Sequence, residues 1–250
     1  MIEVVKGKNV IITGANRGIG FALLEKYAMN GCNVWACIRK ENQEFEQKAK
    51  EMESRFGVWI KIICFDLMNE EEIKRGMQEI IKEKEPIDIL INNAGINSFS
   101  LFQMTRLCDA KDIFQVDYFA PYQIMQFVLR KMTKQKQGCI INMASIAALD
   151  SHAGDSIYGA AKAALITTSK GIAAEVGGLG DIRINSVAPG PTETDMIKIN
   201  LEKIGGKIVS NSAKERLATT KEIADVVFFL TTDEACFING EVIRVDGGKK

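Results

Sequence analysis

The 250-residue sequence predicts an α/β protein in which a parallel sheet lies between two layers of helices. Short segments such as IKIICF, IDILIN and GCIINMA are apolar at almost every position, which is typical of strands buried on both faces. These segments alternate with longer stretches that read as helices, and repeated strand–helix units place successive strands parallel. We expect a single domain over residues 1–250, because the chain shows no repeat, low-complexity tract or linker.

Strands and helices are expected to alternate along the whole chain. Strands are expected at residues 9–13, 33–38, 59–65, 87–91, 138–144, 182–188 and 242–245. Helices are expected at residues 18–30, 41–56, 70–84, 103–135, 156–176 and 220–231, with the fourth broken near Asp109. A polar segment at about 191–218 carries Gly205–Gly206 and no strong apolar period, so we expect it to form a mobile lid.

A glycine-rich turn, in the stretch TGANRGIG, joins the first strand to the first helix. Gly14, Gly18 and Gly20 allow a tight turn and let the backbone approach a pyrophosphate at the helix N-terminus, where free N–H groups favour negative charge. The spacing is G-x-x-x-G-x-G rather than G-x-G-x-x-G, and a plain strand-to-helix turn is the alternative interpretation. The strand before the glycines and the helix after them favour a dinucleotide site.

Tyr158 and Lys162 lie four residues apart in a predicted helix, and Ser145 precedes Tyr158 at the end of an apolar run. Residues at this spacing share one helix face, and many such pairs are ordinary surface contacts. A phenol ionises near pH ~10, but a cationic neighbour stabilises the phenolate and lowers the pKa toward the range useful for proton transfer. A serine hydroxyl nearby can hold the oxygen that gains or loses the proton. The three groups therefore suit interconversion of an alcohol and a carbonyl.

Together these motifs resemble those of the short-chain dehydrogenase/reductase family. TGANRGIG, the NNAG at Asn92 to Gly95, Ser145, Y-x-x-x-K and the PG at Pro189–Gly190 occur in the family's order and spacing, from Gly7 to Gly248. Within the family, APGPTETDM and INGEVIRVDGG are most similar to the 3-oxoacyl-[acyl-carrier-protein] reductases. The resemblance implies a Rossmann-like, doubly wound parallel sheet of about seven strands in the order 3-2-1-4-5-6-7, with helices on both faces.

The resemblance also implies which residues serve the site, with no metal. Ser145 and Tyr158 would hydrogen-bond the carbonyl oxygen, Tyr158 would donate the proton, and Lys162 would lower the Tyr158 pKa and bind the nicotinamide ribose. The expected cofactor-binding residues are Gly14, Asn16, Arg17, Gly18, Ile19, Gly20, Arg39, Asp66, Leu67, Asn93, Ala94, Gly95, Tyr158, Lys162, Pro189, Gly190, Thr192 and Thr194.

The end of the second predicted strand indicates the cofactor. NAD sites carry an acidic residue about 20 positions beyond the glycines, but this position is Ile38, followed by Arg39 and Lys40. Arg39, with Arg17 from the glycine turn, can pair with a 2′-phosphate through charge-assisted hydrogen bonds. A solvated strand end is the alternative for the two basic residues. With the glycine turn in place, we expect NADP(H).

One departure from the family pattern concerns the proton relay. The family usually carries an asparagine in a locally distorted helix before strand five, where its carbonyl holds a water; this chain has Asp117 there. We expect its backbone to serve the same water. A carboxylate close to Lys162 would also stabilise the ammonium and weaken its effect on Tyr158. The alternative is a neutral substitution.

The sequence leaves the substrate open. We expect an NADPH-dependent enzyme that reduces a 3-oxoacyl thioester. The basic docking patch expected for a carrier protein is only half present, because Gly177 and Gly178 follow the Y-x-x-x-K helix. The other half lies before strand five, at Arg130, Lys131, Lys134 and Lys136. The expected substrate walls are mixed: Phe99, Phe102 and Met104 are apolar, while Asp150, Ser151 and His152 are polar.

A sugar, polyol or other small keto compound is therefore an alternative substrate. A catalytically silent NADP-binding regulator is an alternative of another class.

The composition predicts a cytoplasmic protein. The formal net charge is zero, which gives no indication of nucleic-acid or membrane binding, and no apolar run approaches the ~20 residues that span a bilayer. The start, MIEVVKGK, has no signal-peptide core. The family resemblance implies a homo-oligomer, most simply a tetramer. Helices 110–135 and 156–176 carry apolar residues on more than one face, which supports this expectation.

Overall fold

A seven-stranded parallel sheet forms the centre of the computed structural model, which describes residues 5–97, 99–195, 197 and 212–249. The strand order is β3-β2-β1-β4-β5-β6-β7, which confirms the expected topology. The strands are β1 (Asn9–Thr13), β2 (Asn33–Ile38), β3 (Ile60–Cys64), β4 (Ile89–Asn92), β5 (Gln137–Met143), β6 (Asp181–Pro189) and β7 (Val242–Val245). All pairings are parallel.

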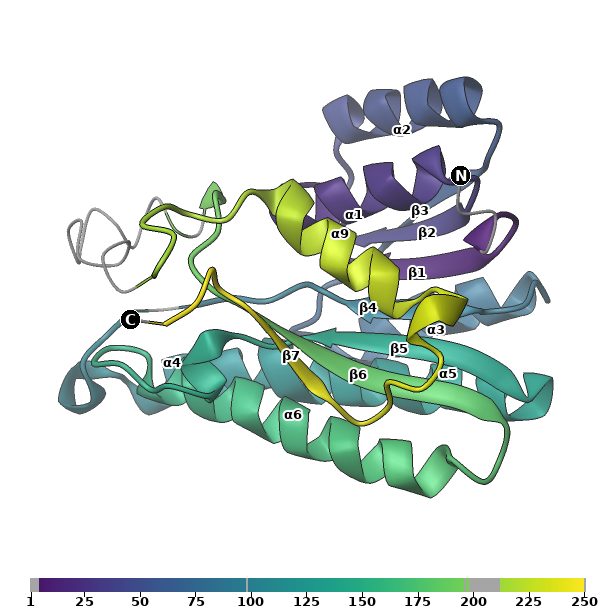
Figure 1. Cartoon of the computed structure of the whole chain (residues 1–250). Coiled ribbons are helices and arrows are strands. Elements are labelled where there is room, and N and C mark those ends of the chain that lie inside the picture. The colour runs from purple at the N-terminus through teal and green to yellow at the C-terminus, as the bar shows by residue number, and fades with distance from the viewer. Residues whose placement is uncertain (1–4, 98, 196, 198–211, 250) are drawn as a thin grey trace.

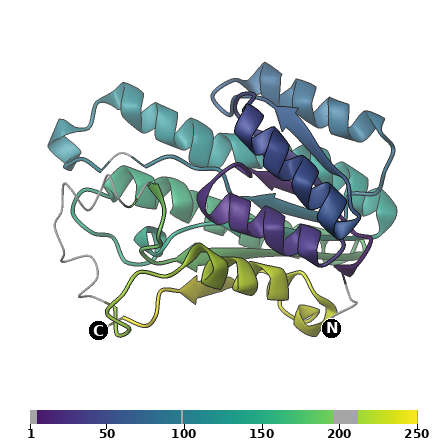
Figure 2. The ribbon, with the colours of Figure 1, turned by 90° about the horizontal axis from the view of Figure 1, so that it is seen from above.

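The helices form two layers, and alternating side chains of the strands separate the two cores. In β1, Val10 and Ile12 join one core, while Ile11 joins the other. The first core is covered by α1 (Gly18–Met29), α2 (Gln43–Phe56) and α9 (Thr220–Leu230), which Figures 1 and 2 show on the same face of the sheet. The second core is covered by α3 (Glu70–Lys82), α5 (Ala120–Gln135) and α6 (Ser156–Val176). Near-continuous apolar strands are thus buried on both faces, as their composition predicted.

Polar side chains cap the N-termini of several helices. The Asn69 side chain accepts hydrogen bonds from the backbone N–H groups of Glu71 and Glu72 at the start of α3. Thr219 and Glu222 form a reciprocal capping box at the start of α9. Such caps satisfy N–H groups that have no partner within the helix.

One expected helix is built differently. The helix expected at 103–135 begins as α4 (Leu107–Phe114), changes to a π-helical turn, labelled η3, at Gln115–Phe119, and continues as α5. The expected break near Asp109 is wrong, because Asp109 lies in the first turn of α4 and pairs with Arg106. The interruption precedes Pro121, which has no N–H to donate to the carbonyl of Asp117 one turn earlier.

The order of the strands reverses at β1, which pairs with β2 on one side and with β4 on the other. From β1 the chain builds the sheet outward in one direction through β2 and β3, and then in the other direction through β4, β5, β6 and β7. A crevice is expected at the carboxyl ends of the strands at such a switch point. Among the described residues, no helix is long and apolar enough to cross a membrane.

The segment expected to be a lid, about 191–218, lies largely outside the described residues. Its two described ends pair with each other: Ala218 donates its N–H to the carbonyl of Pro191, and Glu193 donates to the carbonyl of Ala218.

Candidate active site

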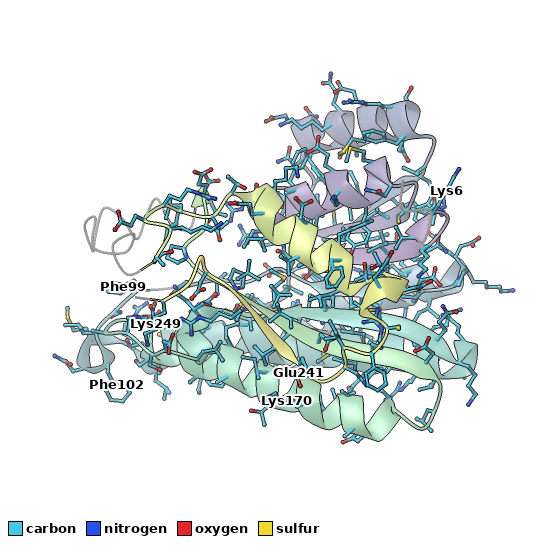
Figure 3. The ribbon with its side chains drawn as sticks, viewed as in Figure 1. Lys6, Phe99, Phe102, Lys170, Glu241 and Lys249 are labelled. Carbon is cyan, nitrogen blue, oxygen red and sulfur yellow. The ribbon has the colours of Figure 1, made fainter. Side chains whose placement is uncertain are left out.

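A cleft of about 1400 Å³ opens at the carboxyl ends of the strands. It is lined by every residue that the sequence predicted for cofactor binding, together with Ser145. The loops after β1, β2, β4, β5 and β6 all contribute, so residues far apart in sequence meet there. In Figure 3, Phe99 and Lys249, which also line the cleft, lie at one end of the molecule and Lys6 lies at the other.

The glycine turn at the cleft floor is tightly built. Gly14 and Gly18 have φ values of 67° and 55°, a region that favours glycine. A Cβ on Gly20 would lie 2.0 Å from the carbonyl oxygen of Gly14, so α1 can begin this close to the turn only with glycine at that position. The first turn of α1 contains no acidic residue, and its N-cap, Arg17, makes no side-chain capping bond. The N-terminus of α1 therefore presents free N–H groups to the cleft, as phosphate binding requires.

Basic side chains stand beside this turn. Arg17, Arg39 and Lys40 line the cleft and are exposed, and none of them has an ion-pair partner among residues 5–97, 99–195, 197 and 212–249. Glu41 and Asp66 also line this part of the cleft. The Asp66 carboxylate accepts a hydrogen bond from the N–H of Met68 at 3.0 Å, which orders the loop after β3.

Asn93 joins the glycine turn to the loop after β4. Its side-chain amide donates to the carbonyl of Thr13 at 2.9 Å, and its own N–H and that of Ala94 donate to the Thr13 hydroxyl. The sequence placed Asn93 beside the cofactor. The structure adds that its side chain also supports the turn.

Ser145, Tyr158 and Lys162 converge on the cleft from two elements, the end of β5 and the first turns of α6. The Ser145 hydroxyl accepts a hydrogen bond from the N–H of Ala147 at 3.1 Å, so its oxygen position is fixed. The Lys162 ammonium lies 5.8 Å from the centre of the Tyr158 ring and donates to the carbonyl of Met143 at 2.9 Å. A Cβ on Gly159 would lie 2.5 Å from the carbonyl oxygen of Ala147, so glycine allows α6 to approach this loop.

Asp117 lies behind Lys162 rather than in the cleft lining. Its carboxylate is completely buried and lies 2.9 Å from the Lys162 ammonium, and its other oxygen accepts from the N–H of Ile96 at 3.3 Å. A Cβ on Gly95 would lie 2.5 Å from the Asp117 carboxylate, so the loop after β4 closes tightly over the pair. The expected proximity of Asp117 and Lys162 is confirmed, and the ion pair is direct.

The electrostatics of the site follow from this burial. Burial lowers the pKa of Lys162, but Asp117 and Tyr158 outweigh that effect and leave it above its ordinary value. Burial raises the pKa of Asp117, against the opposing effect of Lys162. Burial also raises the pKa of Tyr158; Lys162 and Ser145 lower it, while Asp117 and Asp155 raise it, and the pKa remains above its usual value. Lys162 therefore acts on the Tyr158 pKa in the expected direction, but burial and two carboxylates outweigh this one ammonium, so the net pKa is raised rather than lowered.

The loop after β6 closes one side of the cleft. The Thr192 hydroxyl donates to the carbonyl of Gly190 at 2.9 Å, and the Thr194 hydroxyl donates to the carbonyl of Thr192 at 3.3 Å. These bonds hold the loop in a compact turn against the glycine-rich turn, where a Cβ on Gly18 would lie 3.3 Å from Thr194.

The substrate end of the cleft is more polar than the sequence predicted. Asn97 donates to the half-buried Asp155 carboxylate at 3.5 Å, and Asp155 is the N-cap residue of α6, one turn before Tyr158. Burial raises the pKa of Asp155, although the hydrogen bond from Asn97 opposes this. The Phe99 ring lies over Gly154 and leaves no room for a Cβ there. His152 lines the mouth, as expected.

Two expected wall residues lie elsewhere. Phe102 and Met104 are 72% and 70% exposed and are not part of the cleft lining, and Figure 3 shows Phe102 at the outer edge of the molecule. Both residues belong to a 3₁₀ turn, in which the N–H of Met104 donates to the carbonyl of Leu101. In this turn both side chains point outward, into solvent. Ser151 is also exposed and outside the lining.

The C-terminal residues supply a wall that sequence reasoning missed. Arg244 and Lys249 both form ion pairs with Asp150, and Arg244 also pairs with Asp246. All four line the cleft. Arg244 is the exposed position of β7, and an arginine within an otherwise apolar strand is the signal that could have found it.

The basic stretch expected to form half of a docking patch lies away from the cleft. Arg130, Lys134 and Lys136 are exposed at the end of α5 and the turn before β5, next to the amino end of that strand. The cleft lies at the carboxyl ends of the strands. These basic residues therefore do not border its mouth.

Comparisons with known proteins agree with this geometry. A family model described as enoyl-(acyl carrier protein) reductase matches residues 14–250. The 3-oxoacyl-[acyl-carrier-protein] reductase of Aquifex aeolicus is 35% identical over 244 residues, which cover 98% of each chain. The enzyme of the same name from Escherichia coli is 34% identical over 243 residues, 97% of each chain.

Among solved structures, L-sorbose reductase from Gluconobacter frateurii, determined with NADPH and L-sorbose, superposes with a TM-score of 0.91 at 26% identity. The match covers 100% of this chain and 98% of that one.

Proposed function

Because the chain belongs to the short-chain dehydrogenase/reductase family, we propose that it uses NADPH to reduce a 3-oxoacyl thioester to the secondary alcohol. The observation that carries this proposal is the convergence of Ser145, Tyr158 and Lys162 in the same cleft as the glycine-rich turn. The 3-oxoacyl-[acyl-carrier-protein] reductases among its relatives match the chain over nearly its full length, which supports the choice of substrate.

The cleft fits a phosphorylated dinucleotide. Gly14 and Gly20 leave no room for side chains where the turn meets α1, so backbone N–H groups can approach a pyrophosphate. Arg17 and Arg39 stand beside this turn without carboxylate partners among the described residues, so they are available to a 2′-phosphate. When bound, the nicotinamide would supply the hydride.

Tyr158 and its neighbours supply the proton that the reduced carbonyl oxygen takes up. Ser145 and Tyr158 hold the carbonyl oxygen of the substrate, and their hydrogen bonds strengthen as negative charge develops on that oxygen. Tyr158 donates its proton to the oxygen, and Lys162 stabilises the phenolate that remains. Lys162 is held for this role by Asp117 and the carbonyl of Met143.

The direct test is oxidation of NADPH by the purified protein with a short 3-oxoacyl thioester. We expect loss of NADPH absorbance with this substrate and formation of the 3-hydroxyacyl product. An enoyl thioester is the essential comparison, since the matching family model is described by that activity. Turnover of the enoyl thioester without turnover of the 3-oxoacyl thioester would overturn the proposal. Tight NADPH binding without turnover on a broad carbonyl panel would indicate a silent NADP-binding regulator.

A hydroxylated ketone, such as a ketose, is the second candidate substrate. The polar groups of Asn97, Asp155 and the Asp150–Arg244 pair favour it, because a hydroxylated substrate offers donors and acceptors to each of them. The structural likeness to an enzyme solved with L-sorbose also supports this candidate. Values of kcat/KM measured with a ketose and with a 3-oxoacyl thioester distinguish the two candidates. The Asn97→Leu variant should lower kcat/KM for a ketose and change it little for a thioester, because only the ketose needs the amide.

A further inference from the structure

Asp117 makes the catalytic ammonium part of a neutral buried pair. Its carboxylate is completely buried within the π-helical turn Gln115–Phe119 and lies 2.9 Å from the Lys162 ammonium. Lys162 is itself buried, and the carbonyl of Met143 holds it from β5 at 2.9 Å. The ammonium thus donates one hydrogen bond to the Met143 carbonyl and lies in ion-pair contact with the Asp117 carboxylate. The ammonium can neither leave nor turn without breaking both contacts.

The enclosure of this pair leaves no space for a solvent ion to replace Asp117. Gly95 closes over the carboxylate, because a Cβ there would lie 2.5 Å from the Asp117 oxygen and 3.3 Å from the Lys162 nitrogen. The N–H of Ile96 holds the other carboxylate oxygen. The countercharge of Lys162 is therefore built into the fold and remains next to it whatever the salt concentration.

The ion pair changes what Lys162 can do for Tyr158. An unpaired buried ammonium would strongly stabilise a phenolate nearby, whereas a neutral ammonium–carboxylate pair exerts a much weaker field. Asp155, at the start of α6, is a further ionisable group that acts on Tyr158, and the exposed His152 of the preceding loop lines the same cleft. Asp155 also opposes ionisation of the phenol.

We propose that Asp117 is a positioning residue that keeps Tyr158 in its proton-donating form at neutral pH, so that the site is set for carbonyl reduction rather than for alcohol oxidation. This inference rests on the proposed function. Reduction requires a protonated Tyr158 to donate to the new alkoxide, whereas oxidation requires a deprotonated Tyr158 to accept the proton from the alcohol. A fixed carboxylate beside Lys162 favours the first state over the second.

The test compares Asp117→Asn with the unmutated protein in both reaction directions across a pH series. Without the Asp117 carboxylate, the buried Lys162 ammonium has no countercharge. The Tyr158–Lys162 pair should therefore lose a proton at lower pH, whichever of the two groups releases it. We expect the basic limb of kcat for reduction to move down by roughly 1–3 pH units. If Tyr158 releases that proton, the oxidation rate at pH 8 should rise by about tenfold for each unit of the shift, because more of the protein then carries the phenolate base. An unmoved basic limb in a folded variant would overturn the inference.

Glu175→Gln is the matched control. It removes one carboxylate from the exposed surface of the same helix, about 25 Å along α6 from Tyr158, and makes no ion pair in the described part of the chain. Its pH profile should match that of the unmutated protein. A shift equal to that of Asp117→Asn would mean that overall charge, and not the buried pair, sets the profile.

A spectroscopic titration keeps the inference testable if the variant does not fold or if the substrate is wrong. The ultraviolet difference between the unmutated protein and Tyr158→Phe reports ionisation of this one tyrosine and needs no turnover. We expect no phenolate signal from Tyr158 below about pH 10, the ordinary tyrosine value. A phenolate that appears near pH 7 or 8 in the protein without ligand would overturn the inference, even if carbonyl reduction had been demonstrated.

Discussion

Asn93 donates its side-chain amide to the backbone carbonyl of Thr13, at 2.9 Å, and so ties the loop after β4 to the glycine-rich turn after β1. These two strands are neighbours at the centre of the sheet, although 80 residues separate the two positions. The bond crosses the point from which the cleft opens. It makes the shape of the phosphate-binding turn depend on a residue from another part of the chain.

The first prediction tests that bond. Asn93→Ala removes the amide donor and leaves the carbonyl of Thr13 without its partner, which should cost about 1–3 kcal/mol of stability. NADPH affinity should fall with it, because the turn loses its support. Denaturant unfolding and a fluorescence titration with NADPH measure the two effects. Asn30→Ala is the control, since its amide bonds only to its own helix and it should leave NADPH affinity unchanged.

The second prediction concerns the proton donor. Tyr158→Phe removes the hydroxyl with little change in volume, so kcat should fall by about 10²–10⁴ while NADPH affinity stays close to that of the unmutated protein. Steady-state kinetics and a binding titration give both numbers. Tyr122→Phe removes a hydroxyl from an exposed tyrosine of α5 and should leave kcat unchanged. Near-normal turnover by Tyr158→Phe would contradict the assigned role.

The third prediction concerns the choice of cofactor. Arg39 is exposed at the end of β2 with no carboxylate partner in the described part of the chain, so its guanidinium can meet a 2′-phosphate. A charge-assisted hydrogen bond contributes about 1.5–3 kcal/mol, so Arg39→Ala should weaken NADPH binding by about tenfold or more. NADH binding should change little. Dissociation constants that are equal for the two cofactors in the unmutated protein would contradict this prediction.

The fourth prediction concerns assembly. Phe237 is fully exposed in the segment that leads into the edge strand β7, and Phe229 of α9 is about half exposed. Together with the family membership, this apolar surface favours a homo-oligomer, most simply a tetramer. Light scattering should give a mass well above the 27.6 kDa of one chain.

A charged substitution at that edge tests which surface is involved. Phe237→Asp should shift the mass toward smaller species. Met29→Asp adds the same charge at an exposed apolar position at the end of α1 and should not shift it. A mass of one chain for the unmutated protein would exclude the oligomer.

The sequence by itself determined the sheet, most of its helices, and the glycine-turn, cofactor-binding and catalytic residues that meet at the cleft. Parallel strands that are buried on both faces have to be apolar at nearly every position, which is visible in the sequence. The first turn needs glycines because two backbone segments approach closely there, and these glycines are also visible in the sequence. The spacing of Tyr158 and Lys162 places them on one helix face, and the family resemblance added Ser145 and the roles of all three residues.

The tertiary structure alone decided the state of the site. The pKa of Tyr158 depends on burial, on the Lys162 ammonium and on two carboxylates, Asp117 and Asp155, and the sequence does not contain the distances between these groups. The direct Asp117–Lys162 pair required the π-helical turn before Pro121, and the wall formed by Arg244 and Asp150 required β7 to lie beside β6. Electrostatic energies depend on distance and desolvation in three dimensions, whereas a sequence records only which charges are present.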